Sequence, residues 1–185
     1  NNIGLKTKDD SILTNEYGET SLKGIYAIGD VTKAPCLAHK ASHQGIIVAE
    51  KISGKKINKL LKDEDIPSCT YSNPQIASIG LTEEKAKQLG YDINIGNFPF
   101  LANGKALALG EDEGFIKTIF DKNTGELLGA HLVGAEVTEL LSTYIVGKGL
   151  ETTPDEFLSN IFPHPTMSEM LYESVLSSES KAIHY

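Results

Sequence analysis

A histidine between two prolines is the residue of this sequence best suited to acid/base chemistry. His164 lies between Pro163 and Pro165, and Glu169 follows five residues later. The proline rings restrict the backbone around the imidazole and hold this titratable side chain still. A carboxylate bonded to one ring nitrogen fixes the tautomer and raises the basicity of the other. His164 and Glu169 therefore form a candidate general acid/base dyad.

The same segment has an equally specific structural interpretation. Thr166 and Glu169 have the spacing of a capping box, in which the glutamate bonds back to the threonine N–H at the start of a helix. A second such box, from Thr153 to Glu156, has no histidine beside it. The pattern predicts a cap at Glu169 and leaves an added acid/base role open.

A second candidate site combines a carboxylate with the start of a helix. Gly29 and Asp30 follow a short apolar run, and a helix is expected from Leu37. Asp30 can accept hydrogen bonds from ligand hydroxyls, and a helix N-terminus offers unpaired N–H groups. The first turn contains no acid, which leaves that end open to a negative ligand. The alternative is that Gly29 and Asp30 simply turn the chain after a strand.

Motifs for metal binding or nucleophilic catalysis are weak or missing. His39 and His43 have i, i+4 spacing, but no further ligand lies near them in sequence, so a solvated or packed pair is expected and no metal. Cys36 precedes the same helix and is interpreted as a small apolar loop residue. The sequence has no Walker loop, HExxH motif or nucleophile elbow. A hydrolase would therefore have a base without a nucleophile or metal.

The elements that must position these residues fall into two parts. Residues 24–30 are predicted to form a short buried strand, followed by a helix over residues 37–53. Residues 54–67 are charged and end on a proline, which marks a domain boundary. The first part therefore resembles the last strand, loop and helix of an α/β domain. The predicted domains are residues 1–64 and 65–185.

The second part is predicted to be an α+β domain with an antiparallel sheet covered by helices on one face. Strands are expected at 69–72, 76–81, 91–100, 114–121 and 126–134, and helices at 82–90, 135–148, 153–161 and 166–177. Residues 122–125 form a hairpin signal between the last two strands. A run of strands followed by a run of helices favours this architecture.

Composition and charge exclude several classes of function. The 185 residues carry a net charge of −8 at a sequence pI of about 5.1, which disfavours nucleic acids and anionic membranes. No apolar run approaches the ~20 residues that span a bilayer. The two cysteines, Cys36 and Cys69, lie too far apart for a CxxC motif and are too few for a disulfide scaffold. Reduced thiols in a cytosol-like compartment are expected.

Four segments together resemble the dihydrolipoamide dehydrogenases, a branch of the flavoprotein disulfide reductases. They are GIYAIGD, the LAHKA run from Leu37, TYSNPQIASIGLTE from Thr70, and HPTMSE from His164, in the order and approximate spacing of that family. GFIKTIFDKNTGELLGAHLVG resembles the hairpin of the family's dimerisation domain. The resemblance covers nearly the whole chain.

The resemblance implies roles for both candidate sites. Asp30 would bind the ribityl or ribose region of FAD, and the backbone of Cys36, Leu37, Ala38 and His39 would pass along the flavin ring. His164 would exchange a proton with a dihydrolipoamide thiol, and Glu169 would orient its ring. The implied reaction passes electrons from dihydrolipoamide through a protein disulfide and FAD to NAD.

The resemblance also implies partners and a location. In the family the dyad serves the active site of the partner subunit, so a homodimer is expected. The expected larger partner is a 2-oxo-acid dehydrogenase complex, reached through its lipoyl domain. The expected location is cytoplasmic, or the mitochondrial matrix in a eukaryote.

The sequence departs from the family pattern in ways that limit the expected activity. Cys36 stands where the family usually has Met, and Phe162-Pro163 replaces smaller residues before His-Pro. The family's redox pair, two cysteines separated by four residues, is missing, as are the GxGxxG motif and the NAD domain. The chain is therefore expected to be a C-terminal piece, inactive alone, whose first 60 residues are poorly ordered or rearranged.

Two alternatives remain at this point. The chain could be a non-enzymatic dimerisation module, with a subunit interface formed by Val137, Leu140, Leu141, Tyr144 and Ile145. It could also come from another flavin disulfide reductase, such as a glutathione reductase.

Overall fold

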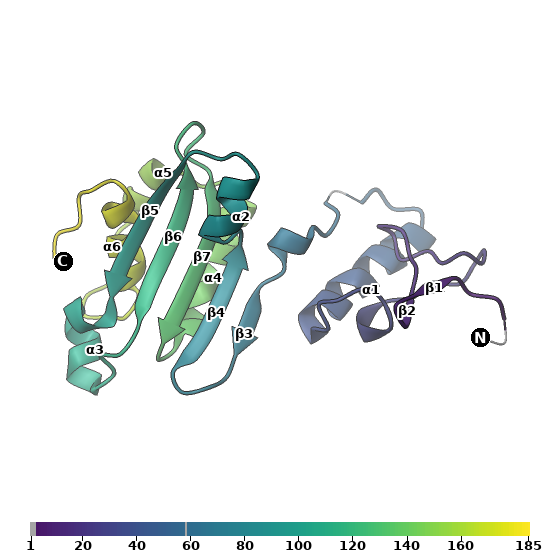
Figure 1. Ribbon diagram of the computed structural model, residues 1–185, viewed down its shortest axis with the longest axis horizontal. Helices are drawn as coiled ribbons and strands as arrows, with labels where there is room; N and C mark the ends of the chain where they lie inside the picture. The colour runs from purple at the N-terminus through teal and green to yellow at the C-terminus, as the bar shows by residue number, and fades with distance from the viewer. Residues whose placement is uncertain (1–2, 58) are drawn as a thin grey trace. The chain divides into compact units, whose positions relative to one another are not determined.

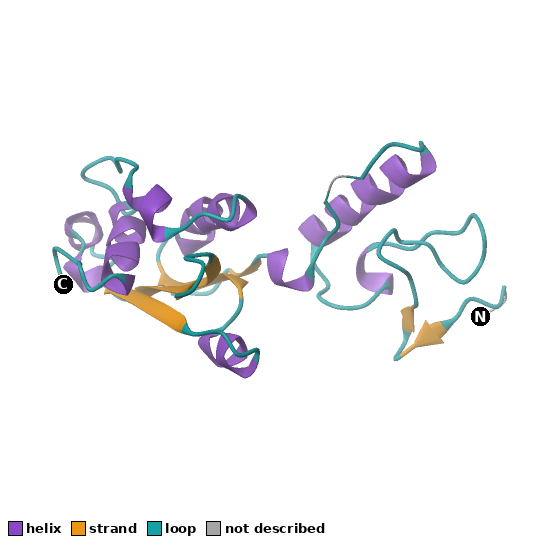
Figure 2. Cartoon of the chain, turned by 90° about the horizontal axis from the view of Figure 1, so that it is seen from above, coloured by secondary structure: helices purple, strands orange, loops and turns teal. Residues whose placement is uncertain are grey.

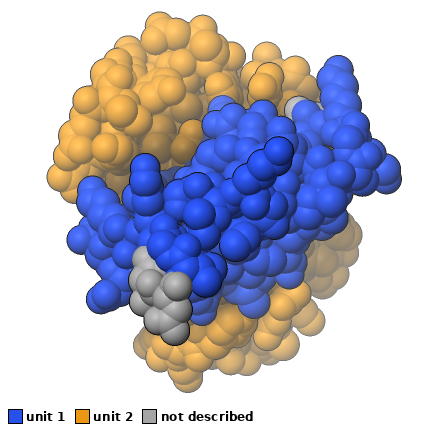
Figure 3. All heavy atoms as spheres, turned by 90° about the vertical axis from the view of Figure 1, so that its right-hand side faces the viewer, with its two compact units in different colours: residues 1–63 blue, residues 64–185 orange. Residues whose placement is uncertain are grey.

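The computed structural model describes residues 3–57 and 59–185. The chain divides into two compact units, Asn1–Asp63 and Glu64–Tyr185, drawn blue and orange in Figure 3. Among the described residues, no helix is long and apolar enough to cross a membrane.

Unit 1 consists of one long helix and a set of loops. Its elements are the antiparallel pair β1 (Thr7–Lys8) and β2 (Ser11–Ile12), the 3-10 helix η1 (Gly29–Val31) and helix α1 (Ala38–Ile52). The strand predicted over residues 24–30 is wrong, because this segment makes only one isolated β-bridge, between Tyr26 and Glu19. A strand needs a neighbour along its length to pair its backbone groups, and the described part of unit 1 provides a partner only at that bridge.

Unit 2 is built on a five-stranded antiparallel sheet in the order β3-β4-β7-β6-β5. The strands are β3 (Ser68–Thr70), β4 (Gln75–Gly80), β5 (Ile93–Pro99), β6 (Phe115–Asp121) and β7 (Leu127–Gly134). The predicted hairpin joins β6 and β7, and its turn is closed by Asp121, whose carboxylate accepts hydrogen bonds from the Asn123 N–H and the Thr124 hydroxyl. The turn chemistry thus sets the register of these two strands.

Helices cover mainly one face of this sheet (Figures 1 and 2). They are α2 (Glu83–Gln88), α3 (Gly104–Leu109), α4 (Val137–Gly149), α5 (Pro154–Leu158) and α6 (Glu169–Ser178), with 3-10 turns η2 (Asp63–Asp65) and η3 (Phe100–Ala102). α4 packs on β4 and β7, α6 packs on β5 and β6, and α5 packs against α6. α2 lies on the opposite face, where Ala86 packs with Ile119 and Leu128. The predicted α+β architecture is confirmed, and the short helix α3 was not expected.

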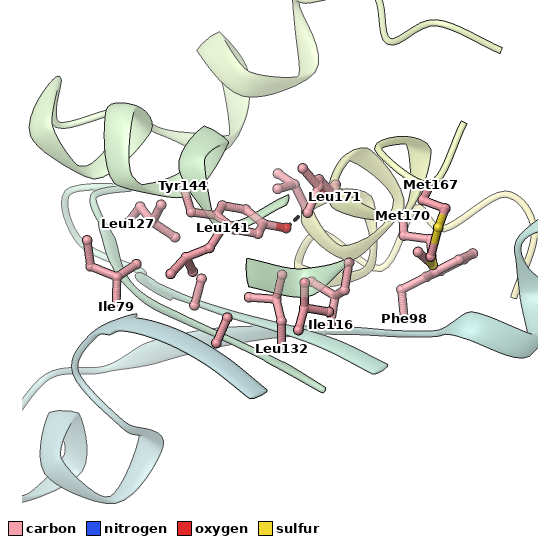
Figure 4. Packing of buried hydrophobic residues seen from close by; sticks show 14 of the residues in the cluster. Ile79, Phe98, Ile116, Leu127, Leu132, Leu141, Tyr144, Met167, Met170 and Leu171 are labelled. Carbon is pink, nitrogen blue, oxygen red and sulfur yellow. Dashed lines mark hydrogen bonds between the residues drawn. The ribbon is translucent and has the colours of Figure 1, made fainter. Parts of the chain in front are cut away.

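The main core lies between the sheet and helices α4 to α6 (Figure 4). Val137, Leu141 and Tyr144 of α4 are each at most 1% exposed and point into this core. Leu140 and Ile145 are half-buried against the same cluster. The predicted subunit interface on this helix is therefore wrong for the buried residues, because the sheet of the same chain already covers them.

A close approach between helix and sheet fixes the position of α6. A Cβ atom added to Gly96 in β5 would lie 1.7 Å from the carbonyl oxygen of Ser174. The hydroxyl of Thr118 in β6 donates to that same oxygen at 3.2 Å. Only glycine permits this contact, which seats the helix that carries Glu169 directly on the sheet.

Candidate functional site

The structure brings His164 and Glu169 together. His164 Nδ1 lies 2.9 Å from Glu169 Oε1. The histidine side chain is 79% exposed, and its Nε2 atom has no hydrogen-bond partner among the described residues. One ring nitrogen is thus engaged by a carboxylate while the other faces outward. This arrangement suits an imidazole that exchanges a proton with an external group.

The carboxylate of Glu169 also forms the predicted bond to the Thr166 N–H, in the turn ahead of its helix. Its second oxygen, Oε2, accepts a hydrogen bond from the Thr166 N–H at 2.8 Å. The Thr166 hydroxyl does not complete the capping box, because it donates instead to the Pro163 carbonyl at 2.7 Å. α6 consequently begins at Glu169, three residues later than predicted. Glu169 thus binds the Thr166 N–H and the imidazole, each through its own oxygen, while α6 itself has no side-chain cap at Ser168.

These contacts keep Glu169 ionised. Burial is the largest single influence and raises the pKa of the Glu169 carboxyl. The hydrogen bonds with Thr166 and His164, with the charges of His164 and His184, outweigh burial and hold that pKa below its ordinary value. The group beside the imidazole is therefore a carboxylate, which can accept a hydrogen bond from Nδ1–H and can pair with an imidazolium.

A row of aromatic rings supports the segment before His164. Phe162 packs against Tyr172 of α6 at 5.6 Å between ring centroids and stacks on Phe157 of α5 at 5.4 Å. Phe157 in turn stacks on the buried Tyr144 of α4 at 5.7 Å. Three helices thereby fix the approach to the His-Pro turn through ring contacts. Phe162 is one of the residues that depart from the family pattern, and here it is a packing residue.

The sequence patterns missed Asn103. Its side-chain oxygen caps α3 by accepting from the Ala106 N–H at 2.8 Å, and its amide nitrogen donates to the Thr166 carbonyl at 3.1 Å. Asn103 is only 6% exposed. The asparagine before a helix could have indicated the cap, but no local signal indicates a contact with a residue 63 positions away. Asn103 ties the connection between β5 and β6 to the turn that carries the histidine.

The second candidate site lies in unit 1, at the turn before α1. Gly29 has φ 73° and its N–H donates to the Gln44 side chain at 2.8 Å, while Thr32 donates to the Gly29 carbonyl. A Cβ on Gly29 would lie 3.3 Å from the Cβ of Ala41 in α1. This glycine therefore lets the turn lie against the helix. Asp30 is exposed at the turn and Cys36 is exposed with a free thiol.

The N-terminus of α1 has no side-chain cap. The cap position is Leu37, which makes no side-chain cap bond, and the first turn beyond it contains no acidic residue. Lys40 is 5% exposed and donates its ammonium proton to the Lys33 carbonyl in the preceding loop. Ala38 and His39 are exposed in the first turn. The predicted residues of this site thus lie around a helix start that has no side-chain cap and no acid in its first turn.

The described residues contain no group of three or more His, Cys, Asp or Glu side chains placed to hold a metal ion. His39 and His43 are both exposed on α1. The two candidate sites belong to different units, so each is described separately.

The chain is similar to known enzymes over almost its whole length. It is 55% identical over 183 residues to the dihydrolipoyl dehydrogenase of Zymomonas mobilis, covering 99% of this chain and 39% of the relative. The corresponding values for the dihydrolipoyl dehydrogenase of Rhizobium etli are 54%, 98% and 38%. The chain thus spans about two fifths of the length of the curated relatives it matches.

Solved structures share the fold. LpdA from Mycobacterium tuberculosis superposes with a TM-score of 0.88 at 22% identity, covering 94% of this chain and 38% of the other. The flavoprotein disulfide reductase RclA from Escherichia coli gives a TM-score of 0.83 at 25% identity, with 94% and 40% covered.

Two family models match the two parts of the chain. The pyridine nucleotide-disulphide oxidoreductase model matches residues 1–45. The dimerisation-domain model of the same enzymes matches residues 66–175, which is more than half of the sequence. The resemblance drawn from the four segments is confirmed, and the chain belongs to the pyridine nucleotide-disulphide oxidoreductase family.

Proposed function

We propose that this chain is the dyad-bearing part of a dihydrolipoyl dehydrogenase, an enzyme that oxidises dihydrolipoamide with NAD as acceptor. The observation that carries the proposal is the contact between His164 Nδ1 and Glu169 Oε1 at 2.9 Å, with the opposite ring nitrogen facing outward. High identity to enzymes of that name over 99% of this chain supports the choice of substrate.

The dyad performs a proton exchange at Nε2 of His164. Glu169 accepts a hydrogen bond from the Nδ1–H group, which keeps the proton on Nδ1 and leaves a lone pair on Nε2 to take a proton from a substrate thiol. The thiolate then attacks a disulfide sulfur, and the carboxylate stabilises the imidazolium that results. The reverse transfer returns the proton to a leaving thiolate. The low pKa of Glu169 keeps it an acceptor throughout this cycle.

The disulfide must come from residues outside this sequence. The chain has two cysteines, Cys36 and Cys69, and both are free thiols. Cys69 is half-buried in β3, where burial, with a smaller effect from the charge of Glu139, raises the pKa of its thiol. A thiol with a raised pKa is a poor nucleophile near neutral pH. We therefore propose that the dyad serves the active site of a second subunit in a homodimer.

The turn at Asp30 and the uncapped start of α1 fit a flavin. An exposed carboxylate suits hydroxyl groups, and a helix start with no side-chain cap and no acid in its first turn suits electronegative atoms of a ring system. The buried Lys40 holds the loop between them through the Lys33 carbonyl. When bound, FAD supplies the electron route from the reduced disulfide to NAD. By the same proposal, the lipoyl domain of a 2-oxo-acid dehydrogenase complex delivers the substrate.

The test is His164→Gln in the full-length protein that contains this sequence. We expect kcat with dihydrolipoamide to fall by roughly 10²- to 10⁴-fold, because the general acid/base is lost. Flavin absorbance and the dimer mass should not change. Unchanged turnover would leave the chain a dimerisation module without a catalytic base.

The second capping box provides a matched control. Glu156 binds the Thr153 N–H as Glu169 binds the Thr166 N–H, but no histidine lies beside it. Glu169→Gln should lower kcat, whereas Glu156→Gln should change helix stability only. Equal kcat values for these two variants would contradict the proposed role of Glu169.

A further inference from the structure

A second histidine–carboxylate pair lies on the same helix as the dyad. His184 Nδ1 is 2.6 Å from Glu173 Oε1, and the Ile183 N–H donates to Glu173 Oε2 at 3.0 Å. The Glu173 side chain is only 6% exposed, although it ends in a carboxyl group. Buried carboxylates are rare unless they are fully paired. Both of its oxygens are used, and both hold the segment that follows α6.

The chain reverses direction to reach this glutamate. Ser180 has a left-handed φ of 57°, and the Lys181 N–H donates to the Leu176 carbonyl at 2.9 Å. This is the hydrogen-bond pattern that ends a helix and turns the chain back. Tyr185 then contacts Phe98 of β5 edge to face at 6.4 Å between ring centroids. Residues 181–185 therefore run back along α6.

The reversal brings a second imidazole toward the dyad. Glu169 and Glu173 are four residues apart, which places them on one face of α6, one turn from each other. His184, bound to Glu173, consequently lies within electrostatic reach of Glu169, and its charge contributes to the low pKa of that carboxyl. Each of the two carboxylates on this face thus binds one imidazole, Glu169 that of His164 and Glu173 that of His184.

Besides His184, the possible neighbours of the Glu169 carboxylate are the ionisable groups on the elements packed against α6. β5 carries none. Those on β6, on α5 and in the segment after α6 have other partners or are exposed: Lys117 pairs with Glu83, Asp121 with Thr124, Glu156 with Thr153 and Lys181 with Glu179, while Asp155 is exposed.

We propose that Glu173 is a positioning residue that anchors residues 183–184 and thereby holds the His184 imidazole beside Glu169. This inference rests on the proposed function for its catalytic meaning, since Glu173 would act on the reaction only through Glu169. An imidazolium held there favours the ionised form of the carboxylate that orients His164.

The test is a double-mutant cycle followed by NMR titration of the Glu169 side-chain carboxyl in the chain of residues 1–185. At the acidic pH where carboxylates titrate, imidazoles are protonated. His184→Gln should therefore raise the Glu169 pKa, by about half a pH unit. In a Glu173→Gln background the same His184→Gln change should have no effect, because the imidazole is no longer held. Glu179→Gln, another carboxylate near the end of α6, is the matched control and should leave the response to His184→Gln intact.

Two outcomes would overturn the proposal. No response of Glu169 to His184→Gln in the native background would mean that the imidazole is not beside it. An equal response in both backgrounds would mean that Glu173 does not position it. If Glu173→Gln fails to fold, Ile183→Pro removes one of the two bonds to Glu173 and leaves the buried carboxylate intact. It should then reduce the response to His184→Gln, and a full response would equally overturn the proposal.

Activity of the full-length protein gives a separate outcome. Glu173→Gln should lower kcat a few-fold and displace the pH profile of kcat with little change in KM, an effect that loss of stability alone does not produce. A protein with no dihydrolipoamide activity would defeat the proposed function and leave the titration result standing. A flat titration with normal activity would defeat only the role of Glu173.

Discussion

The two units of this chain differ sharply in how they bury their apolar residues. Unit 2 encloses a continuous cluster between its sheet and helices α4 to α6. Among the described residues of unit 1, the buried hydrophobic side chains are Ala27 and Ile47, while Ile25, Ile28 and Val31 are between 37% and 48% exposed. Unit 2 thus buries its apolar residues within itself, whereas unit 1 leaves several of its apolar residues partly exposed. The predictions below test this difference.

Amide hydrogen exchange should separate the two units most strongly. Amides in β6, β7 and α6 are paired within a sheet or helix over a packed core, so they should open only with global unfolding. Residues 24–31 should exchange roughly 10³-fold faster or more, because local opening there exposes little new apolar surface. Mass-spectrometric exchange on the purified chain measures this. Equal protection throughout residues 3–57 would show that unit 1 is as self-contained as unit 2.

Truncating one core residue in each unit should give unequal losses of stability. Leu171 is fully buried in the main core, so Leu171→Ala should lower the free energy of unfolding of unit 2 by about 2 to 5 kcal/mol. Ile47→Ala is the counterpart in unit 1, where Ile47 is 8% exposed but has few buried apolar neighbours. Its effect on the main urea transition should be below about 1 kcal/mol. Similar losses of unfolding free energy for the two variants would contradict the proposed difference in packing between the units.

Removing one hydroxyl from the core of unit 2 should have a moderate effect. Tyr144 Oη is 2.6 Å from Ser174 Oγ and donates to the Leu171 carbonyl at 3.2 Å, and burial raises the pKa of its phenol far above the ordinary range. Tyr144→Phe should lower the free energy of unfolding by about 1 kcal/mol. The loss is limited because Ser174 still donates to the Leu171 carbonyl. A loss as large as that of Leu171→Ala would indicate that the hydrogen bond, rather than the ring, holds α4 to α6.

The smallest expected effect is a pH-dependent one on the surface of unit 2. Hydrogen bonds from Lys117 and then Lys87 lower the pKa of Glu83 from 4.5 to about 2, against a smaller effect of burial. Because the folded-state pKa is depressed, the stabilisation is fully present above about pH 4.5 and is lost as the pH falls toward 2. Glu83→Gln should therefore lower the melting temperature at pH 7 and make no difference near pH 2.

Glu84→Gln is the control for this change. Glu84 accepts a hydrogen bond from the neutral side chain of Gln88, so its replacement should leave the pH dependence of melting as it is in the native chain. The same pH dependence in both variants would mean that the lysine pairs of Glu83 are not its cause.

The same difference between the units explains which parts of the fold could be predicted from the sequence. The β6–β7 hairpin was predictable because its turn residues and alternating pattern act locally. The structure of residues 24–30 could not be predicted in this way, because a strand needs neighbouring strands to pair with as well as an apolar run. An apolar run alone therefore indicates that a segment is buried, but it does not identify the elements that pack against it.

The candidate site shows the same limit at shorter range. The spacing of His164 and Glu169 predicted their contact, since five residues across a rigid turn leave few alternatives. The start of α6 was predicted three residues too early, because the Thr166 hydroxyl binds the Pro163 carbonyl. The contact from Asn103 to the Thr166 carbonyl joins segments 63 residues apart and follows only from the tertiary fold.

The two oxygens of Glu169 leave little freedom for redesign. The same carboxylate binds the Thr166 N–H in the turn ahead of α6 and orients an imidazole, so any substitution that changes one contact also disturbs the other. Ser168 occupies the N-cap position without a side-chain cap bond, so the two roles could be separated only by a residue there, such as Asp, whose side chain binds an N–H of the first turn. Until then, the acid/base strength of this histidine and the stability of the helix beneath it must vary together.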